Sequence, residues 1–264
     1  FYVSPNGNDR WSGTLPLHQS GDEGPFATLQ AARDAVRRLK GVGDFDHPVT
    51  IMLLEGTYRL DGPLVLDARD SGTADSPITW CAFPGHQPQL SGGIELTDWQ
   101  VHEGAIKKCS LSRKWNFRQL FFNGQRQVRA RWPKRDAEDP LYGGWAWVEQ
   151  TLPEGEEDCD TFRYAPVDVK PKRWAKLDQA ELNVFVWYCW VNRLVPIKEI
   201  NLTTRTITVG PDPINKFMHL LKGNRFIIEN VLEELNEPGE WCLDTQTGTV
   251  YFWPPEDGGE VVVP

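Results

Sequence analysis

The stretch FRQLFFNGQRQVRA, residues 117–130, sets the dipeptide Asn123-Gly124 between two segments rich in β-prone side chains. Asn-Gly is the pair that best supplies the positive φ angles of a type I′ turn, so the stretch predicts a tight hairpin. Residues 195–201 with 205–209, and 241–244 with 250–253, show the same order of strand, turn and strand. The pattern therefore predicts that the middle of the chain is antiparallel β-structure.

Upstream of this hairpin, one segment has the spacing of an amphipathic helix. Leu29, Ala32, Val36 and Leu39 recur at three- and four-residue steps, and Thr28 can cap the first turn. Short runs rich in β-branched residues follow at 49–54, 64–66, 78–83 and 89–90. Their spacing is typical of two successive coils of a solenoid, and we expect the helix to cover the open end of that stack.

The composition is that of a folded protein, because its 264 residues are 40% hydrophobic and 25% charged, with a formal net charge of −9. No basic run offers the charge needed to bind a phosphate backbone, so we expect no nucleic-acid partner. Every apolar run is far shorter than the roughly 20 residues that cross a bilayer, so we expect no membrane span. Cysteines and histidines are dispersed without metal-ligand spacing, and we expect no metal and no cofactor.

Twelve tryptophans are a heavy load for this length, and many lie in or beside predicted loops. A flat indole can cover the apolar face of a sugar ring while nearby polar groups bind its hydroxyls. The alternative is that these side chains fill a β-rich core, as we expect for Trp241 and Trp253. The aromatic candidates for carbohydrate binding are Trp132, Tyr142, Trp145, Trp147 and Trp190.

Arg129 and Arg131 lie near the end of a predicted hairpin strand, where period-two alternation places them on one face. Their guanidinium groups are suited to sugar hydroxyls, or to a carboxylate such as that of a uronic acid. The alternative is that they form ion pairs with the acidic loop at 136–139. We expect the acidic residues of 229–240 to be structural, because spacing in sequence does not measure the separation that a catalytic pair requires.

Several motifs along the chain are those of a known family. They are FYVSPNGND at 1–9, GPFATL at 24–29, EGTY at 55–58, DSGT at 70–73, LSGG at 90–93, and the stretches 123–133 and 229–241. On these motifs the chain resembles the N-terminal region of bacterial right-handed parallel β-helix proteins of the pectate-lyase-like superfamily, particularly their glycoside hydrolase-like members.

The resemblance implies an all-β fold: the start of a right-handed parallel β-helix with an N-terminal capping helix and an inserted antiparallel β-rich domain. It places the cap and first coils at 1–109, the inserted domain at 110–224 and the return to the β-helix at 225–264. Similar proteins carry their paired catalytic carboxylates in later coils. The resemblance therefore assigns no catalytic residue here and implies, as a partner, the remaining β-helix coils of a longer chain.

The resemblance also implies the N-terminal part of a glycoside hydrolase that acts on a complex poly- or oligosaccharide and is secreted, periplasmic or at the cell surface. Two alternatives stay open. A polysaccharide lyase or epimerase on the same fold would need a Ca²⁺ site and a base near a uronic acid. A non-catalytic glycan-binding or structural module would need only a binding surface, which the sequence places between Arg129 and Trp147.

Overall fold

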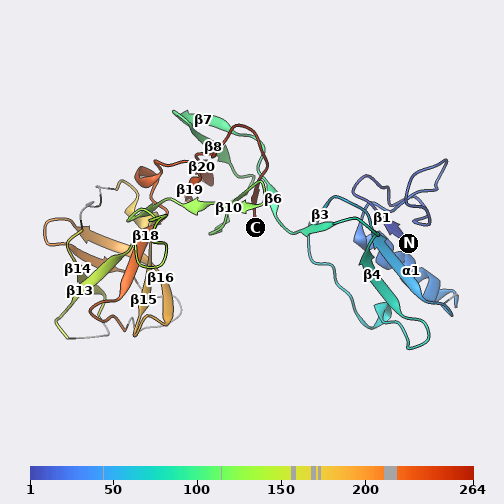
Figure 1. Ribbon diagram of the computed structural model, residues 1–264, viewed down its shortest axis with the longest axis horizontal. Helices are drawn as coiled ribbons and strands as arrows, with labels where there is room; N and C mark the ends of the chain where they lie inside the picture. The colour runs from blue at the N-terminus through green and yellow to red at the C-terminus, as the bar shows by residue number, and fades with distance from the viewer. Residues whose placement is uncertain (44, 114, 156–158, 168–170, 172–173, 211–218) are drawn as a thin grey trace. The chain divides into compact units, whose positions relative to one another are not determined.

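The structure is a computed structural model that describes residues 1–43, 45–113, 115–155, 159–167, 171, 174–210 and 219–264. The chain divides into two compact units, Phe1–Ile94 and Glu95–Pro264 (Figure 1). Within the described residues, no helix is long and apolar enough to span a membrane. The domain boundaries that the resemblance implies, at residues 110 and 225, stay a prediction.

The first unit joins a helix to short parallel sheets. One sheet contains β1 (Tyr2–Val3), β2 (Val49–Leu53) and β4 (Ile78–Ala82), a second contains β3 (Thr57–Arg59) and β5 (Gln89–Ser91), and the 3₁₀ helix η1 covers Ala68–Asp70. Helix α1 (Leu29–Gly41) begins after Thr28, whose hydroxyl accepts a hydrogen bond from the amide of Ala31 at 3.1 Å. The helix predicted from its apolar spacing is therefore confirmed, and it buries that face against Val3 and Ile51.

The second unit begins and ends in two sheets made largely of hairpins. A five-stranded sheet has the order β11 (Val128–Arg129), β19 (Glu240–Asp244), β20 (Thr249–Phe252), β8 (Ile106–Ser110) and β7 (Gln100–Glu103). A four-stranded sheet has the order β10 (Gln125–Arg126), β9 (Phe121–Phe122), β21 (Val261–Val263) and β6 (Ile94–Glu95). The predicted hairpin turn is confirmed, because β9 pairs with β10 around Asn123 and Gly124, whose φ angles are 49° and 73°.

The other strands of this unit close into a six-stranded antiparallel barrel (Figure 1). Their order is β18 (Arg225–Glu229), β13 (Ala146–Leu152), β14 (Thr161–Tyr164), β17 (Thr206–Val209), β16 (Val191–Asn201) and β15 (Glu181–Val186), and β15 pairs again with β18. Strand β12 (Arg131–Trp132) adds to β18, and the 3₁₀ helices η2 (Leu177–Gln179) and η3 (Leu232–Glu234) lie between strands. Large buried side chains fill the core, among them Trp132, Phe162 and Phe226.

The prediction of a right-handed parallel β-helix with an N-terminal capping helix is wrong, although the chain is all-β with one helix. The runs at 49–54 and 78–83 do pair in parallel, but in the second unit β11 pairs in parallel with β19 while the pairs of the barrel are antiparallel. In the second unit, β15 with β16, β16 with β17, and β19 with β20 form antiparallel hairpins, and antiparallel pairs between strands farther apart in sequence, such as β14 with β17 and β15 with β18, close the barrel. Helix α1 packs into its own unit's core and caps no stack of coils.

Candidate functional site

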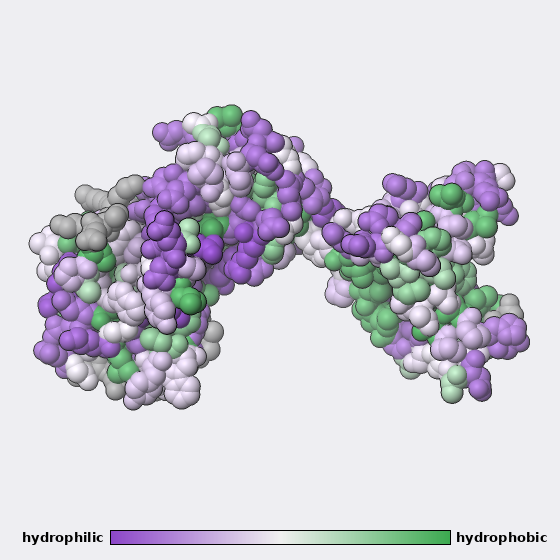
Figure 2. Space-filling view, viewed as in Figure 1, coloured by the Kyte–Doolittle hydropathy of each residue, from purple (hydrophilic) through white to green (hydrophobic). Residues whose placement is uncertain are grey.

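A cleft of about 620 Å³ opens on the outside of the barrel, between barrel strands and the segment that runs from β10 to β12. It is lined by Arg118, Arg126, Gln127, Val128, Arg129, Arg131, Arg135, Asn183, Asn192, Leu194 and Glu229. We name it the arginine cleft, because five of these side chains are arginines. Figure 2 shows hydrophilic residues gathered on the visible face over β10 and β18.

Alternation along β15 explains why polar side chains reach this cleft. Leu182, Val184 and Val186 are buried in the barrel core, so Glu181 and Asn183 face outward. In the antiparallel register, Glu181 lies opposite a residue of β18 and Asn183 lies opposite a residue of β16. Closure of the barrel thus brings the outward side chains of three strands to one wall of the arginine cleft.

Glu181 ties this wall of the barrel to the facing segment. Its carboxylate accepts hydrogen bonds from Nε and Nη2 of Arg118, at 3.1 and 2.5 Å, and another from Nη1 of Arg129. Burial disfavours the charge on Glu181, but the hydrogen bonds and charges of the two arginines outweigh burial and lower the pKa of this carboxyl. Glu181 is therefore an ionised anchor and is poorly suited to donate a proton.

The two predicted arginines, Arg129 and Arg131, both line the arginine cleft. The Arg129 side chain is only 5% exposed, and its Nε has no hydrogen-bond partner in the described part of the chain. Arg131 donates from Nε to the carbonyl oxygen of Pro133 at 2.8 Å and from Nη2 to that of Gly144, while burial lowers its pKa. The predicted alternative, pairing with the acidic loop at 136–139, is not what holds them.

Trp145, another predicted residue, supports the cleft from beside it. Its ring centroid lies 5.5 Å from Cζ of Arg131 and 4.6 Å from Cζ of Arg225. The ring of Phe185 meets Trp145 edge-on, with centroids 5.7 Å apart. Because a guanidinium group is attracted to the face of an indole, the half-buried Trp145 helps to orient Arg131 towards the cleft.

The other predicted aromatic residues differ in exposure. Tyr142, Trp147 and Trp190 are 71%, 37% and 72% exposed, so their rings can reach a ligand. Trp132 is 1% exposed and packs among the aromatic rings of the barrel core, so it cannot contact one. Trp241, which we expected in the core, is fully buried.

An exposed group of rings lies at the hairpin between β15 and β16. We name Trp187, Tyr188 and Trp190 the aromatic tip; the ring centroids of Trp187 and Trp190 are 6.0 Å apart, and those of Tyr188 and Trp190 are 6.5 Å apart. Tyr188 is 83% exposed. Exposed aromatic clusters commonly mark binding surfaces. Since Asn192 of the arginine cleft follows Trp190 by two residues on the same hairpin, cleft and tip are neighbouring parts of one outer face.

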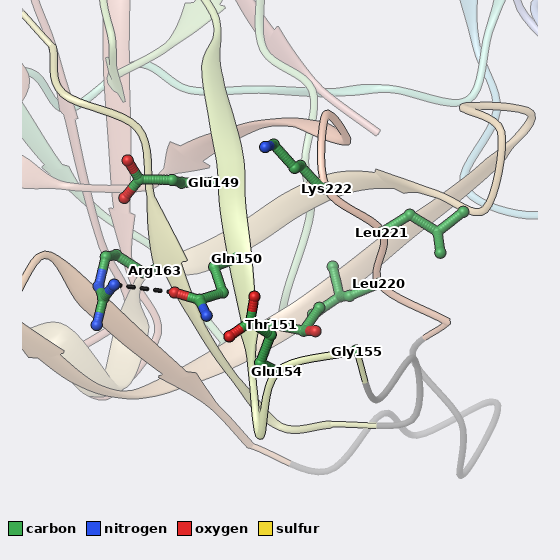
Figure 3. Close-up of a pocket in the computed structure, with 9 residues that line it drawn as sticks. All are labelled: Glu149, Gln150, Thr151, Glu154, Gly155, Arg163, Leu220, Leu221 and Lys222. Carbon is green, nitrogen blue, oxygen red and sulfur yellow. Dashed lines mark hydrogen bonds between the residues drawn. The ribbon is translucent and has the colours of Figure 1, made fainter.

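A second hollow, of about 500 Å³, opens on the barrel beside β13 and β14 (Figure 3). Within it Arg163 donates to the side-chain oxygen of Gln150 at 2.9 Å, and the carboxylate of Glu149 accepts a hydrogen bond from Arg205 at 2.9 Å. No aromatic side chain is among its lining residues. The arginine cleft shares this lack of lining rings, but it is larger, at about 620 Å³, and has five arginines where this hollow has one, so the hollow is the weaker candidate.

The acidic residues of 229–240 include several that stabilise the fold. Glu240 is buried and pairs with Lys134 at 2.7 Å, and burial raises the pKa of this carboxyl despite that partner. Glu234 accepts a hydrogen bond from the indole of Trp174 at 2.9 Å. In the described ranges, no three His, Cys, Asp or Glu side chains are grouped as metal ligands would be.

Sequence reasoning missed much of the arginine cleft, including Arg118, Arg135, Glu181, Asn183 and Asn192. The alternation of polar and apolar residues over 181–186 is a signal that could have marked a strand with one outward polar face. Arg118 carries no such signal, because only its contact with a residue 63 positions away defines its place.

The whole chain is similar to part of a solved structure described as a glycoside hydrolase, with a TM-score of 0.79 and 27% identity over 100% of this chain and 45% of that one. A structure described as the complex of XylC with xylose matches 92% of this chain and 33% of that one at 17% identity, but its TM-score of 0.35 carries no argument. No protein-family model matches, and neither does any curated protein. The chain is thus glycoside hydrolase-like, which suggests a carbohydrate-active protein.

Proposed function

We propose that this chain is the sugar-binding part of a glycoside hydrolase that acts on a complex poly- or oligosaccharide. The observation that carries the proposal is the likeness of the whole chain to a solved glycoside hydrolase at a TM-score of 0.79. The arginine cleft adds hydrogen-bond donors for sugar hydroxyls, and the aromatic tip adds exposed rings for the apolar faces of pyranoses. A polysaccharide is too large to cross a membrane, which supports a secreted, periplasmic or cell-surface location.

The proposal places the catalytic carboxylates outside residues 1–264. Glu229 lines the arginine cleft and Glu181 binds two of its arginines, but a glycosidase needs one carboxyl group that stays protonated near neutral pH. Two arginines keep Glu181 ionised, and Glu229 accepts a hydrogen bond from the amide of Asn183 at 3.3 Å. Because both carboxylates already have hydrogen-bond partners, they support binding, and not bond cleavage, as the function of this surface.

A non-catalytic glycan-binding module is the second candidate, and the same engaged carboxylates favour it. The two candidates differ in the activity of a longer protein that contains this chain. Release of reducing ends from a bound polysaccharide would support the hydrolase. Products that absorb ultraviolet light through a new double bond would instead indicate a lyase. Binding without any cleavage would indicate a non-catalytic glycan-binding module.

Binding of the 264-residue protein to a glycan array, followed by calorimetric titration of the best ligand, tests what both candidates share. We expect binding to saccharides that weakens when Trp147 and Trp190 are both replaced by Ala. Lys198→Gln is a matched control on the outside of the same barrel, because Lys198 is exposed and does not line the arginine cleft. Failure of every glycan to bind would contradict the proposal.

A further inference from the structure

The arginine cleft holds a surplus of positive charge. Five guanidinium groups line it, whereas the carboxylates available to them are Glu229 in the lining and Glu181, which Arg118 and Arg129 share. The chain as a whole is strongly acidic, with a formal net charge of −9. A local excess of arginine on an acidic protein is therefore a feature of this surface and does not reflect the overall composition.

Within the described residues, one hydrogen-bond donor of the Arg129 side chain, beside the arginine cleft, has no partner. Its side chain is 95% removed from solvent, yet its Nε has no hydrogen-bond partner within the described residues. A buried donor left without a partner is destabilising, and native proteins rarely keep one without a reason. Arg129 lines the cleft and adds positive charge to it, but this buried Nε lies out of reach of a ligand oxygen, so direct contact falls to the exposed arginines.

Arg126 and Arg135 make the charge accessible. Both side chains are exposed, and neither forms an ion pair with any carboxylate in the part of the chain that the structure describes. Burial lowers the pKa of Arg131; the charge of Glu229 opposes this shift, and the charge of Arg135 adds to it more weakly. Like charges that line one cleft repel each other, and a bound anion would relieve that repulsion.

The rest of the lining is suited to a sugar. Asn183 and Asn192 provide neutral amides, joined by a hydrogen bond of 2.5 Å from Asn192 to Asn183, and Leu194 provides an apolar contact. The volume of about 620 Å³ falls within the range of small-ligand sites, which is about 300 to 1,000 Å³. Amides bind hydroxyls, and arginine forks bind the paired oxygens of a carboxylate or sulfate.

We infer that the arginine cleft binds a saccharide that bears an anionic substituent, a carboxylate or a sulfate, so that the substrate class of this protein is an acidic glycan. The inference rests on the proposed function and narrows it. Arg126 and Arg135 bind the anion, the buried Arg129 adds positive charge to the cleft, and the two asparagines contact hydroxyls of the sugar ring.

Calorimetric titration of the 264-residue protein with three probes tests this assignment. The probes are an oligogalacturonate, a sulfated chondroitin oligosaccharide and a neutral galacto-oligosaccharide of equal length. We expect one of the acidic probes to bind at least about tenfold more tightly than the neutral one, because charge-assisted hydrogen bonds exceed neutral ones in strength. This preference should shrink as salt is raised.

The double variant Arg126→Gln, Arg135→Gln should weaken acidic-probe binding at least about tenfold and neutral-probe binding by a much smaller factor, since the neutral probe loses hydrogen bonds but no charge interaction. The double variant to Lys should recover part of the loss, because it restores charge without the fork. Lys198→Gln makes the same kind of charge change outside the cleft and should have no effect. Thermal unfolding of each variant checks that the fold is intact.

Equal affinity for acidic and neutral probes, or no response to the double Gln variant, would overturn the inference while the proposed function stands. Binding of inorganic sulfate with the same affinity as the acidic probes would also overturn it, because the sugar would then contribute nothing. Failure of every saccharide to bind would overturn the inference and the proposed function together.

Discussion

The two faces of strand β15 have different roles. On the inner face, Leu182, Val184 and Val186 are at most 1% exposed and belong to the packed barrel core. On the outer face, Asn183 lines the arginine cleft and Glu181 binds two of its arginines. Alternate residues of one strand thus contribute to stability or to binding, and substitutions on the two faces should separate these properties.

Phe226→Ala should have the largest effect, because it removes a large side chain from the inner side. Phe226 is fully buried, and its ring lies 5.2 Å from that of Phe162. Loss of a buried Phe leaves a cavity and should lower the free energy of unfolding by about 4 kcal/mol. Urea denaturation measures this change in the free energy of unfolding. A change under about 1 kcal/mol would mean that the barrel core is not a cooperative part of the fold.

Glu181→Gln should destabilise the protein by about 3 kcal/mol near neutral pH, because it leaves two arginines without their shared carboxylate. The pKa of Glu181 is lowered in the folded state, so its stabilisation is complete above the unfolded pKa of about 4.3 and is lost as pH falls through the lower, folded value.

Urea denaturation across this pH range measures the effect as a converging difference between wild type and variant. Glu199→Gln is the matched control, because Glu199 is exposed on the neighbouring strand β16. A wild-type to variant difference that stays constant down to low pH would show that Glu181 does not act through its charge.

Gly124→Val should lower the free energy of unfolding by about 1 to 2 kcal/mol, because a β-branched residue is strained at the left-handed φ of 73°. Apart from the glycine itself and its two chain neighbours, no atom of the described residues lies within 4 Å of the place that a new Cβ would take, so crowding adds little. Since the turn carries β10 and Arg126 to the arginine cleft, glycan affinity should also fall. Gly85→Val, at another open left-handed position in the first unit, should destabilise similarly without altering affinity.

Trp190→Ala should have the smallest effect on stability, within about 0.5 kcal/mol, because the side chain is 72% exposed. We expect saccharide affinity to fall about fivefold, as loss of about 1 kcal/mol of ring contact would cause. Calorimetry and urea denaturation together check both values. Unchanged affinity would remove the aromatic tip from the proposed binding face and restrict that face to the arginine cleft.

Local features of the fold were predictable from the sequence. Asn123-Gly124 predicts its turn because few other residue pairs tolerate two positive φ angles, and Thr28 with its apolar spacing predicts α1. The prediction of a parallel β-helix went beyond these local signals and was wrong. Two short parallel pairs look alike in sequence whether further coils follow or hairpins replace them, since the decision depends on how later strands pair.

The candidate site divides in the same way. Arg129 and Arg131 both line the cleft, as predicted, but they lie on two short strands of different sheets, β11 and β12, so alternation along one strand is not what brings them together. Trp132 and Trp190 have the same side chain, yet one is fully buried and the other exposed, since burial depends on which strands surround each ring.

By itself, the sequence determined the turns and the helix, because each depends on residues a few positions apart. Only the tertiary structure decided that β15 returns to β18, which closes the barrel and sets Glu181 against Arg118 and Arg129. Such contacts join distant residues, and their energy depends on register and burial that exist only after the strands have paired.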